Sequence, residues 1–506
     1  MKLADSRDIA RCLDLAWEQV GTSDSDLDLP DVINFADTDF RWEAYRQTLL
    51  GKILAGDYKP ASVDIVDLPK NILTVRPLSR LSLDRRLAYE AAVLAAAPQI
   101  DKIIPASVYS SRWWKRQQRL LGPVGSWLRM QREARSLHKR EPSLLLARTD
   151  VTAFYEYVDN DILTSDLESI SIPGWSVELI SNFLDAFNHL GNAWGIPQGF
   201  DTSGLLANLY LLPVDSEISR NRLKHFRYSD DIYIFGNSWV ELRQAIIDIT
   251  GTLRNRHLTL SSSKTRIIPS NLIVKEFEEA EKDAINYGIT VDSPKTRAEL
   301  WDFFDRTVAE ERIDPRDLKF ALSQLSRVHD DYAVFWLTSN LGEIPHVSRE
   351  ALYYLAQFHR EEPKLGQSVV ELLSNSKLFL YPFAQQHLLI YLIRQGVRLP
   401  EAREVAWRLL LDRNKESFVR EFAARYLGLF GVAGDGARLK QEFQQETHTR
   451  VRRALLVAIH EANVSSRQWL RSVANAIPEL GDTAAYLKTE PAEIPLPITR
   501  KSYAWS

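Results

Sequence analysis

Residues 226–235 have the sequence FRYSDDIYIF. Two runs rich in aromatic and β-branched residues flank the pair Asp230-Asp231, which predicts two β-strands joined by a tight turn. Such a turn usually takes Asn-Gly or Asp-Gly for its backbone preference, although adjacent aspartates most often simply mark a solvated turn. Here the two carboxylates repel each other between apolar strands, and a divalent cation would remove that cost. Because Mg²⁺ takes carboxylate oxygens and shares them with substrate phosphates, this hairpin is a candidate Mg²⁺ site.

A third carboxylate, Asp150, lies upstream at the end of another predicted strand. The apolar run at residues 144–147 leads into Asp150 after two polar residues, as expected of a short buried strand. Two divalent cations held about 4 Å apart by such carboxylates activate the attacking oxygen and stabilise the leaving oxygen in phosphoryl transfer. Asp150, Asp230 and Asp231 are therefore candidate metal ligands.

A glycine loop, GIPQG at residues 195–199, lies between these carboxylates in the sequence. Pro197 fixes φ and the two glycines allow close backbone approach, so the loop can lie against a planar or phosphate-bearing ligand. The apolar run at residues 203–212 has helical spacing, and residues 201–202 (Asp-Thr) are its expected N-cap. The alternative is a tight turn before a helix that binds nothing.

Length and composition limit the class of protein. A chain of 506 residues predicts two to four domains. Its 45% hydrophobic and 26% charged residues exclude a largely disordered chain. No apolar run approaches the roughly 18 residues of a membrane span, and the N-terminus lacks the apolar core of a signal peptide. The single cysteine, Cys12, excludes internal disulfides and zinc sites built from several thiolates. We therefore expect a cytoplasmic protein without a membrane partner.

Charge is unevenly distributed, although the net charge is only −4. Residues 1–40 hold ten Asp/Glu against three Lys/Arg, and we expect a solvated segment with a short helix near residues 8–20. Residues 111–140 invert the balance, since nine Lys/Arg face only Glu133 and three tryptophans are interleaved. This stretch is either a solvated helical face with core tryptophans or a phosphate-contacting strip with aromatic stacking.

Beyond about residue 295 the pattern is almost purely helical. FAQQHL at 383–388 recurs 39 residues later as FAARYL, and Val419-Arg420 recurs 32 residues later as Val451-Arg452. These spacings favour stacked helix pairs of the HEAT type, with an irregular helical bundle as the alternative.

Several ordered motifs together resemble a known family. Four stretches of this sequence resemble the palm motifs of reverse transcriptases: RTDVTAFY at 148–155, GIPQG at 195–199, RYSDD at 227–231 and LTLSSSKT at 258–265. Three stretches upstream resemble the fingers motifs of bacterial reverse transcriptases: LPK at 68–70, RPL at 76–78 and LDRR at 83–86. The resemblance covers roughly residues 45–270 and implies a right-hand polymerase, an α/β fold with fingers and palm, followed by an all-α HEAT-like domain. The expected segments are an acidic N-terminal segment (1–44), fingers and palm (45–275), a helical connection (276–340) and a HEAT-like helical domain (341–506).

The resemblance implies a metal site. Asp150 and Asp230 would hold two Mg²⁺ ions, with Mn²⁺ as an alternative. Asp231 would act as a supporting carboxylate, and the carbonyl of Val151 would be a main-chain ligand. Lys264 would lie near the pyrophosphate leaving group and act as general acid. For Lys264 the alternative is an ordinary surface lysine.

The resemblance also implies a nucleotide site. Tyr155 would be the aromatic gate that rejects a ribose 2′-hydroxyl, and Gln198, followed by Gly199, would pack against the incoming nucleotide. Lys70 and Arg76 would bind its triphosphate. The alternatives are a core aromatic at Tyr155 and a surface lysine at Lys70.

A palm followed directly by a long helical segment resembles the abortive-infection group of defence-associated reverse transcriptases. That group assembles as trimers or hexamers and makes DNA that is covalently primed from the protein, often without a template. Residues 71–75 lack the usual glycine turn before Arg76, which departs from ordinary template handling.

The resemblance thus implies dNTP substrates, a single-stranded DNA product attached to the protein, a homo-oligomer, and RNA as a further candidate partner. Tyr45 and Tyr503 are candidate priming residues. Two other hypotheses are a templated reverse transcriptase of a mobile element and a degenerate palm that acts as a non-enzymatic sensor.

Overall fold

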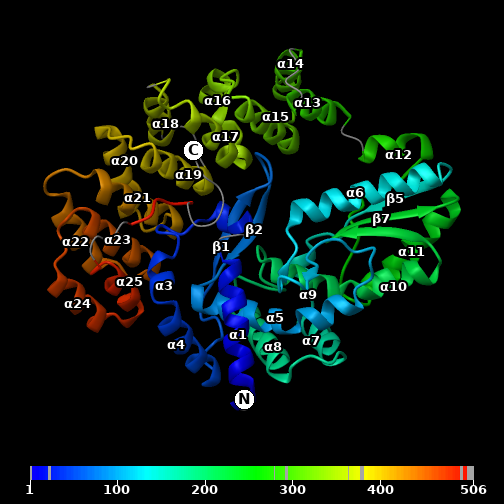
Figure 1. Cartoon of the computed structure of the whole chain (residues 1–506), viewed down its shortest axis with the longest axis horizontal. Coiled ribbons are helices and arrows are strands. Elements are labelled where there is room, and N and C mark those ends of the chain that lie inside the picture. Colours follow the sequence, from blue (N-terminus) through cyan, green and yellow to red (C-terminus); the bar gives the residue numbers. More distant parts are fainter. Residues whose placement is uncertain are drawn as a thin grey trace. The chain divides into compact units, whose positions relative to one another are not determined.

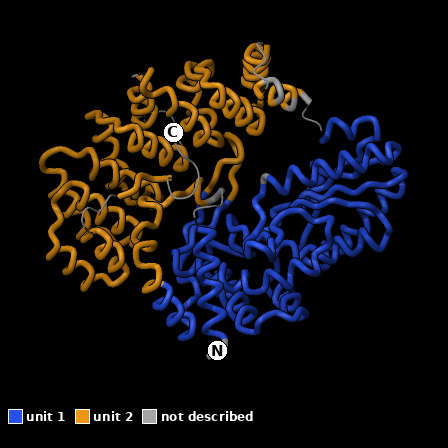
Figure 2. Tube along the Cα trace, viewed as in Figure 1, with its two compact units in different colours: residues 1–23, 46–66, 77–279 blue, residues 24–45, 67–76, 280–506 orange. Residues whose placement is uncertain are grey.

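The chain forms two compact units, each assembled from separate stretches of sequence (Figure 2). Unit 1 comprises residues 1–23, 46–66 and 77–279, and unit 2 comprises residues 24–45, 67–76 and 280–506. The computed structural model describes residues 3–20, 24–277, 280–290, 295–362, 364–375, 381–489 and 494–498. The units divide the N-terminal segment between them, and the domain boundaries expected after residues 44, 275 and 340 stay a prediction.

Unit 1 contains a four-stranded antiparallel sheet with the order β6-β7-β5-β8. Its strands are β5 (Leu145–Thr149), β6 (Lys224–Tyr228), β7 (Asp231–Gly236) and β8 (Arg266–Ile268). The predicted hairpin is confirmed, because β6 pairs with β7 across the turn and Tyr228 opposes Asp231. The predicted strand before Asp150 is confirmed as β5, which pairs on both of its edges.

Helices cover both faces of this sheet (Figure 1). On one face, α6 (Pro123–Arg140) and α12 (Ser270–Phe277) enclose an apolar core. That core includes Met130, Leu137, Leu146, Tyr233, Phe235, Ile268 and Phe277. On the other face, α10 (Leu212–Arg220) and α11 (Trp239–Arg254) contact the strands. Because both faces are covered, every residue of β7 after Asp231 is buried.

The long helix α5 (Leu83–Ile103) organises the rest of unit 1 and is buried along most of its length. It packs against α1 (Leu3–Gln19), α8 (Gly174–Asn188) and α9 (Asp201–Tyr210). The shorter elements are β3 (Trp113–Trp114), β4 (Arg119–Leu120), the 3₁₀ helix η1 (Phe154–Tyr157) and α7 (Asn160–Glu168). Helix α4 (Trp42–Leu54) and the hairpin of β1 (Asp64–Pro69) and β2 (Val75–Arg80) fall partly in each unit.

Two expectations about local structure are wrong. The helix expected near residues 8–20 is present as α1, but it is not part of a solvated segment, because α1 has apolar residues at helical spacing and buries them completely. These residues are Ile9, Cys12, Leu13 and Ala16. Helix α9 begins at Asp201, so Phe200 takes the N-cap position and no side chain caps the helix there. Phe200 is buried, and the guanidinium carbon of Arg86 lies 5.1 Å from the centre of the Phe200 ring. Tertiary packing therefore sets where the helix begins.

In its described residues, unit 2 contains helices and, as its only strand residues, its share of the β1–β2 hairpin. Its helices are α2 (Asp24–Asp28), α3 (Ala36–Phe40), α13 (Ala280–Thr290), α14 (Thr296–Ala309), α15 (Pro315–Arg327), α16 (Val334–Asn340), α17 (Ser348–Gln357), α18 (Lys364–Ser374), α19 (Pro382–Arg394), α20 (Pro400–Leu411), α21 (Ser417–Phe430), α22 (Asp435–Gln445), α23 (Thr449–Glu461), α24 (Arg467–Ala476) and α25 (Gly481–Tyr486). Helices α17, α19, α21 and α23 pack one on the next, and α18 packs on α20. This order suits stacked helix pairs, while the HEAT-like assignment stays a prediction.

Buried charge fixes the N-terminal residues of unit 2. Arg453 Nη1 lies 2.5 Å from Asp31 Oδ2, and its Nη2 lies 2.7 Å from Asp37 Oδ1. Burial is the largest influence on the pKa of Asp31 and would raise it, but the charge and hydrogen bonds of Arg453, together with the N–H groups of Phe35 and Ile33, lower that pKa overall. Asp31 and Asp37 therefore have a structural partner. No helix in the described parts of either unit combines the length and apolar character needed to cross a membrane.

Candidate active site

Asp150 lies at the end of β5, an inner strand of the sheet. The Ser261 N–H donates to the Asp150 carbonyl at 2.7 Å, which fixes the backbone there. Asp150 is only 6% exposed. The register of β5 and β7 pairs Thr149 with Ile232, so the next residues, Asp150 and Asp231, lie at the same end of the sheet.

The turn between β6 and β7 consists of Ser229 and Asp230. Ser229 has a φ of 56°, in the left-handed region that residues other than glycine seldom adopt. Its N–H donates to Ser110 Oγ at 2.8 Å, and its carbonyl accepts from Arg227 Nη1 at 3.0 Å. Two side chains thus hold the residue that directly precedes Asp230.

Asp150 and Asp231 are close enough to Asp230 to perturb its pKa. The pKa of Asp230 rises to about 6, first because burial disfavours its charge and then because the Asp150 carboxylate lies beside it. Asp231 adds a smaller repulsion. Arg148 Nη2 lies 3.8 Å from Asp231 Oδ1 and provides a nearby positive charge.

Lys264 joins this cluster from the loop that precedes β8. Its Nζ donates to Asp150 Oδ2 at 2.7 Å, while the rest of its side chain is largely exposed. Thr265 holds the loop against the sheet, because its hydroxyl lies 2.7 Å from that of Thr149. The structure therefore brings the predicted lysine onto a predicted metal ligand.

The donor set suits a hard divalent cation, because it offers carboxylate oxygens whose mutual repulsion a cation would relieve. Across the described ranges, no group of three or more Asp, Glu, His or Cys side chains is arranged to hold a metal alone. Mg²⁺ usually binds through one or two carboxylates together with substrate phosphates, so Asp150 and Asp230 fit a cation that arrives with a nucleotide. Val151 is buried and forms an isolated β-bridge with Leu260. The role of its carbonyl as a metal ligand stays a prediction.

Tyr155 lies on η1 and is joined to the glycine loop at residues 195–199. The Ile196 N–H donates to the Tyr155 carbonyl at 3.0 Å. A Cβ at Gly195 would lie 2.1 Å from this carbonyl, and Gly195 has a φ of +70°, so only glycine fits. A Cβ at Gly204 would lie 3.3 Å from Tyr155 Oη, which places the hydroxyl end of the ring against α9.

Gln198 is fixed by its backbone, while part of its side chain is unpaired. Its N–H donates to Ser79 Oγ at 3.2 Å, and the Ser79 N–H donates to its carbonyl at 2.9 Å. Within the described ranges, Gln198 Oε1 is buried without a hydrogen-bond partner. An unmade bond at a buried acceptor is costly, so this oxygen is suited to a ligand. The next residue, Gly199, has a φ of 111°.

The remaining two predicted site residues, Lys70 and Arg76, fall in unit 2, whereas all the others fall in unit 1. Both are exposed, Lys70 just after β1 and Arg76 within β2. Their binding to a triphosphate stays a prediction.

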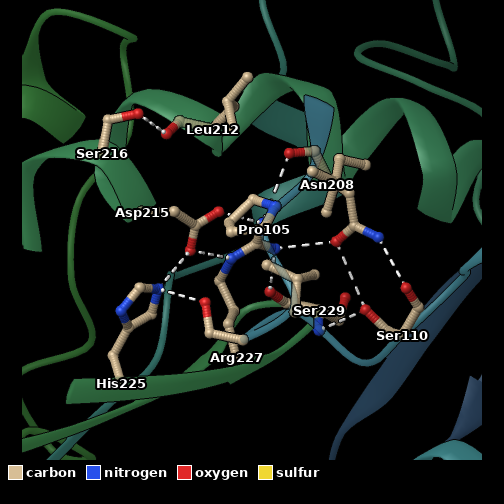
Figure 3. A network of polar contacts seen from close by, with 12 residues as sticks. Pro105, Ser110, Asn208, Leu212, Asp215, Ser216, His225, Arg227 and Ser229 are labelled. Atoms are coloured by element: carbon tan, nitrogen blue, oxygen red, sulfur yellow. Dashed lines mark hydrogen bonds and ion pairs between the residues drawn. The ribbon is translucent and has the colours of Figure 1, made fainter. Parts of the chain in front are cut away.

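A buried polar network that was not predicted lies beneath the turn, where Arg227 contacts Asp215 and Asn208 (Figure 3). A signal for it existed in β6. His225 and Arg227 occupy alternate positions of a strand whose other side chains are aromatic or end residues, so both basic side chains point to one face. That face is buried, and a buried arginine requires partners.

Comparison with known proteins agrees with this geometry. Residues 68–293 match the family model described as reverse transcriptase (RNA-dependent DNA polymerase), a range that includes the carboxylates, Tyr155, Gln198 and Lys264. No curated protein matches the sequence. The match supports a reverse transcriptase family and implies a fingers and palm fold. The matched domain is that of an RNA-directed DNA polymerase, a nucleotidyltransferase whose substrates are nucleotides and nucleic acid.

Replacing Asp230 by Asn should stabilise the metal-free protein at neutral pH by about 1–3 kcal/mol. In the wild type, the folded-state pKa of about 6 exceeds the ordinary value of 3.8. The free energy of unfolding therefore falls as the pH rises from about 4 through about 6, and the variant lacks this loss. Urea unfolding across this pH range measures the difference. Asp161→Asn, at an exposed carboxylate of α7, is the control and should leave the pH profile unchanged.

Replacing Lys264 by Met should tighten Mn²⁺ binding several-fold in the absence of nucleotide, because the ammonium that competes for Asp150 is removed. The same variant should lower nucleotide incorporation by about 100-fold, as expected when a general acid is lost. Titration calorimetry with Mn²⁺ and a single-turnover assay measure the two effects. Lys275→Met, at an exposed lysine of α12, is the matched control. Weaker Mn²⁺ binding by K264M would contradict the competition.

Proposed function

We propose that this protein is a cytoplasmic DNA polymerase of reverse-transcriptase type that acts in antiviral defence by abortive infection. It adds dNTPs by two-metal phosphoryl transfer and starts DNA from a hydroxyl group of the protein, without requiring a template. The observation that carries the catalytic part is the convergence of Asp150, Asp230 and Lys264 at one end of the sheet. The defence role is supported by the order of a reverse-transcriptase domain followed by a long helical region.

Asp150 and Asp230 would hold two Mg²⁺ ions, or Mn²⁺ in their place, with Asp231 and the Val151 carbonyl in supporting roles. When bound, these ions supply Lewis-acid activation of the attacking oxygen and stabilisation of the pyrophosphate leaving group. The turn fixes the backbone of Asp230 before any substrate arrives, so its carboxylate already lies beside that of Asp150.

Three cationic side chains act on the triphosphate: Lys264, Lys70 and Arg76. Lys264 holds a proton at Nζ and releases it to the departing pyrophosphate as general acid. Lys70 and Arg76 neutralise the triphosphate before transfer. Both are exposed, as residues that meet a soluble nucleotide must be.

Gln198 and Tyr155 position the nucleotide. The unpaired Oε1 of Gln198 gains a partner when a nucleotide packs on the loop, and Gly199 lets the backbone approach. The ring of Tyr155 fills the space that a ribose 2′-hydroxyl would need. Its position is fixed at both ends, by the Ile196 N–H at its carbonyl and by Gly204 near its hydroxyl.

A basic strip, formed by β3, β4 and α6, supports handling of the growing strand. Its exposed cations are Lys115, Arg116, Arg119, Arg129, Arg132, Lys139 and Arg140. The Arg119 guanidinium lies 5.4 Å from the ring of exposed Trp114, a pair suited to stacking with bases. The strip reaches the catalytic hairpin, because Tyr228 donates from its hydroxyl to the Pro123 carbonyl at 2.9 Å and meets the Trp127 ring edge-on at 5.1 Å.

Priming and assembly complete the proposal. Tyr45, on α4, stacks on Trp42 with ring centroids 6.2 Å apart, and Tyr503 lies outside the described residues. Assembly as a trimer or hexamer rests on the resemblance to the abortive-infection group. The description of the matched family as RNA-dependent favours a second candidate function, templated reverse transcription on RNA.

Replacing Tyr155 by Val should relax the preference for dNTPs over rNTPs by about tenfold or more, because the smaller side chain leaves room for a 2′-hydroxyl. Competition between labelled dNTPs and rNTPs measures the ratio of kcat/KM values. Tyr157→Val is the matched control, since Tyr157 lies on the same 3₁₀ helix with 58% exposure. An unchanged ratio in Y155V would remove Tyr155 from the site.

Incubation of the purified protein with labelled dNTPs and Mg²⁺ should give label that stays with the polypeptide on a denaturing gel and is released by protease. Asp150→Asn should abolish the signal, and Tyr45→Phe tests one priming residue. Label that runs as free DNA, and only when an RNA template and primer are supplied, would replace the proposal with templated reverse transcription. No incorporation under either condition would favour the sensor.

A further inference from the structure

All five N–H groups of the Arg227 guanidinium have an acceptor, although this side chain is fully buried (Figure 3). Nε and Nη2 donate to the two carboxylate oxygens of Asp215, at 2.9 and 2.6 Å. Nη1 donates to Asn208 Oδ1 at 2.9 Å and to the Ser229 carbonyl at 3.0 Å. Nη2 also donates to the Asn208 carbonyl at 3.4 Å. Four of the five bonds thus end on helices α9 and α10, and the fifth ends on the catalytic turn.

The backbone of Arg227 is fixed as well. Its N–H donates to the Ser107 carbonyl at 2.8 Å, and its own carbonyl accepts from the Tyr109 N–H at 3.0 Å. Asp215, which is 1% exposed, also lies 3.2 Å from His225 Nε2. Two sets of contacts therefore fix the guanidinium that binds Ser229: the hydrogen bonds of the Arg227 backbone and the ion pair with Asp215.

Ser110 and Asn208 hold the other side of the turn (Figure 3). Ser110 Oγ accepts from the Ser229 N–H at 2.8 Å and donates to Asn208 Oδ1 at 3.4 Å. Asn208 Nδ2 donates to the Ser110 carbonyl at 2.7 Å. Both polar groups of the Ser229 backbone are bound by buried or half-buried side chains, and its left-handed φ is thereby maintained.

We propose that Arg227 is the positioning residue of the catalytic turn: it holds the Ser229 carbonyl and so keeps the Asp230 carboxylate beside that of Asp150. Asp215 supplies the charge that lets the guanidinium remain buried, and Asn208 links it to Ser110. This inference rests on the proposed role of Asp150 and Asp230 as metal ligands. Two carboxylates that repel each other separate unless the backbone beneath one of them is fixed, and Arg227 provides that restraint.

Stability alone does not account for this network. A buried ion pair is often no more stabilising than apolar side chains of the same volume, because desolvation offsets the attraction. What an apolar pair cannot do is bind the Ser229 carbonyl. A lysine cannot replace the arginine either, because its single nitrogen lacks the fork that reaches Asp215 and Ser229 together.

The test removes both charges at once, with Arg227→Met combined with Asp215→Leu. No unpaired charge remains, so we expect Tm to stay close to the wild-type value. We expect the Kd for Mn²⁺, measured on the full chain without nucleotide, to rise by about tenfold or more, as for other groups that orient metal ligands. We expect kcat to fall with little change in the KM for dNTP, and amide hydrogen exchange to accelerate at residues 229–231.

The matched control is Arg425→Met combined with Glu461→Leu in unit 2. Arg425 is also fully buried, and its Nη2 lies 2.9 Å from Glu461 Oε1. This control should leave Mn²⁺ binding and exchange at residues 229–231 unchanged, which separates the loss of a buried ion pair in general from the loss of this one.

Wild-type Mn²⁺ affinity together with wild-type exchange in the Arg227 and Asp215 double variant would overturn the positioning role. If that variant does not fold, Arg227→Lys alone is tested by the same Mn²⁺ titration and hydrogen exchange. Wild-type values of both in Arg227→Lys would likewise overturn the positioning role. A wild-type protein that binds no Mn²⁺ either with or without dNTP would overturn the proposed metal site instead, and hydrogen exchange at residues 229–231 would still decide whether Arg227 positions the turn.

Discussion

Repulsion between Asp150 and Asp230 is the constraint on which the candidate active site at the end of the sheet depends. It helps to raise the pKa of Asp230 to about 6, so folding brings these carboxylates together against an opposing force. Backbone geometry holds them there. The pairing of β5 with β7 sets the position of Asp150, and the left-handed conformation of Ser229 sets that of Asp230. A site that pays this cost during folding already has its two carboxylates side by side when a substrate arrives.

Local sequence patterns predicted the elements that carry these carboxylates. The strand β5 and the β6–β7 hairpin follow from short apolar runs and a polar turn, and each of these signals is local to its own short stretch of sequence. The start of α9 was not predictable in this way. Asp201 is a good capping residue, yet Phe200 is buried against Arg86 and the helix begins one residue earlier than the cap would place it. Contacts between residues distant in the sequence overrode the local preference.

The same reasoning explains which site residues were found and which were missed. Lys264 was expected near the leaving group, and the structure shows it bound to Asp150. Arg227 was passed over because its partners, Asp215 and Asn208, lie 12 and 19 residues earlier in the sequence, on helices whose placement no local pattern reveals. For Lys70 and Arg76 the motif is visible in the sequence, but they belong to the other compact unit, so geometry adds nothing to the motif.

Buried arginines place irregular segments in both units. In unit 1, Arg227 is neutralised by a helical carboxylate and uses a remaining N–H to hold the carbonyl of Ser229. In unit 2, Arg425 is neutralised by Glu461 of α23 and donates to the carbonyl of Val32, which also lies in a turn. Neither carbonyl can be satisfied by a helix or sheet, and a planar group with five donors can serve a carboxylate and a carbonyl at the same time. The cost of burying the charge is thus accepted for the geometry it fixes, and in unit 1 that geometry is the conformation of the turn that precedes Asp230.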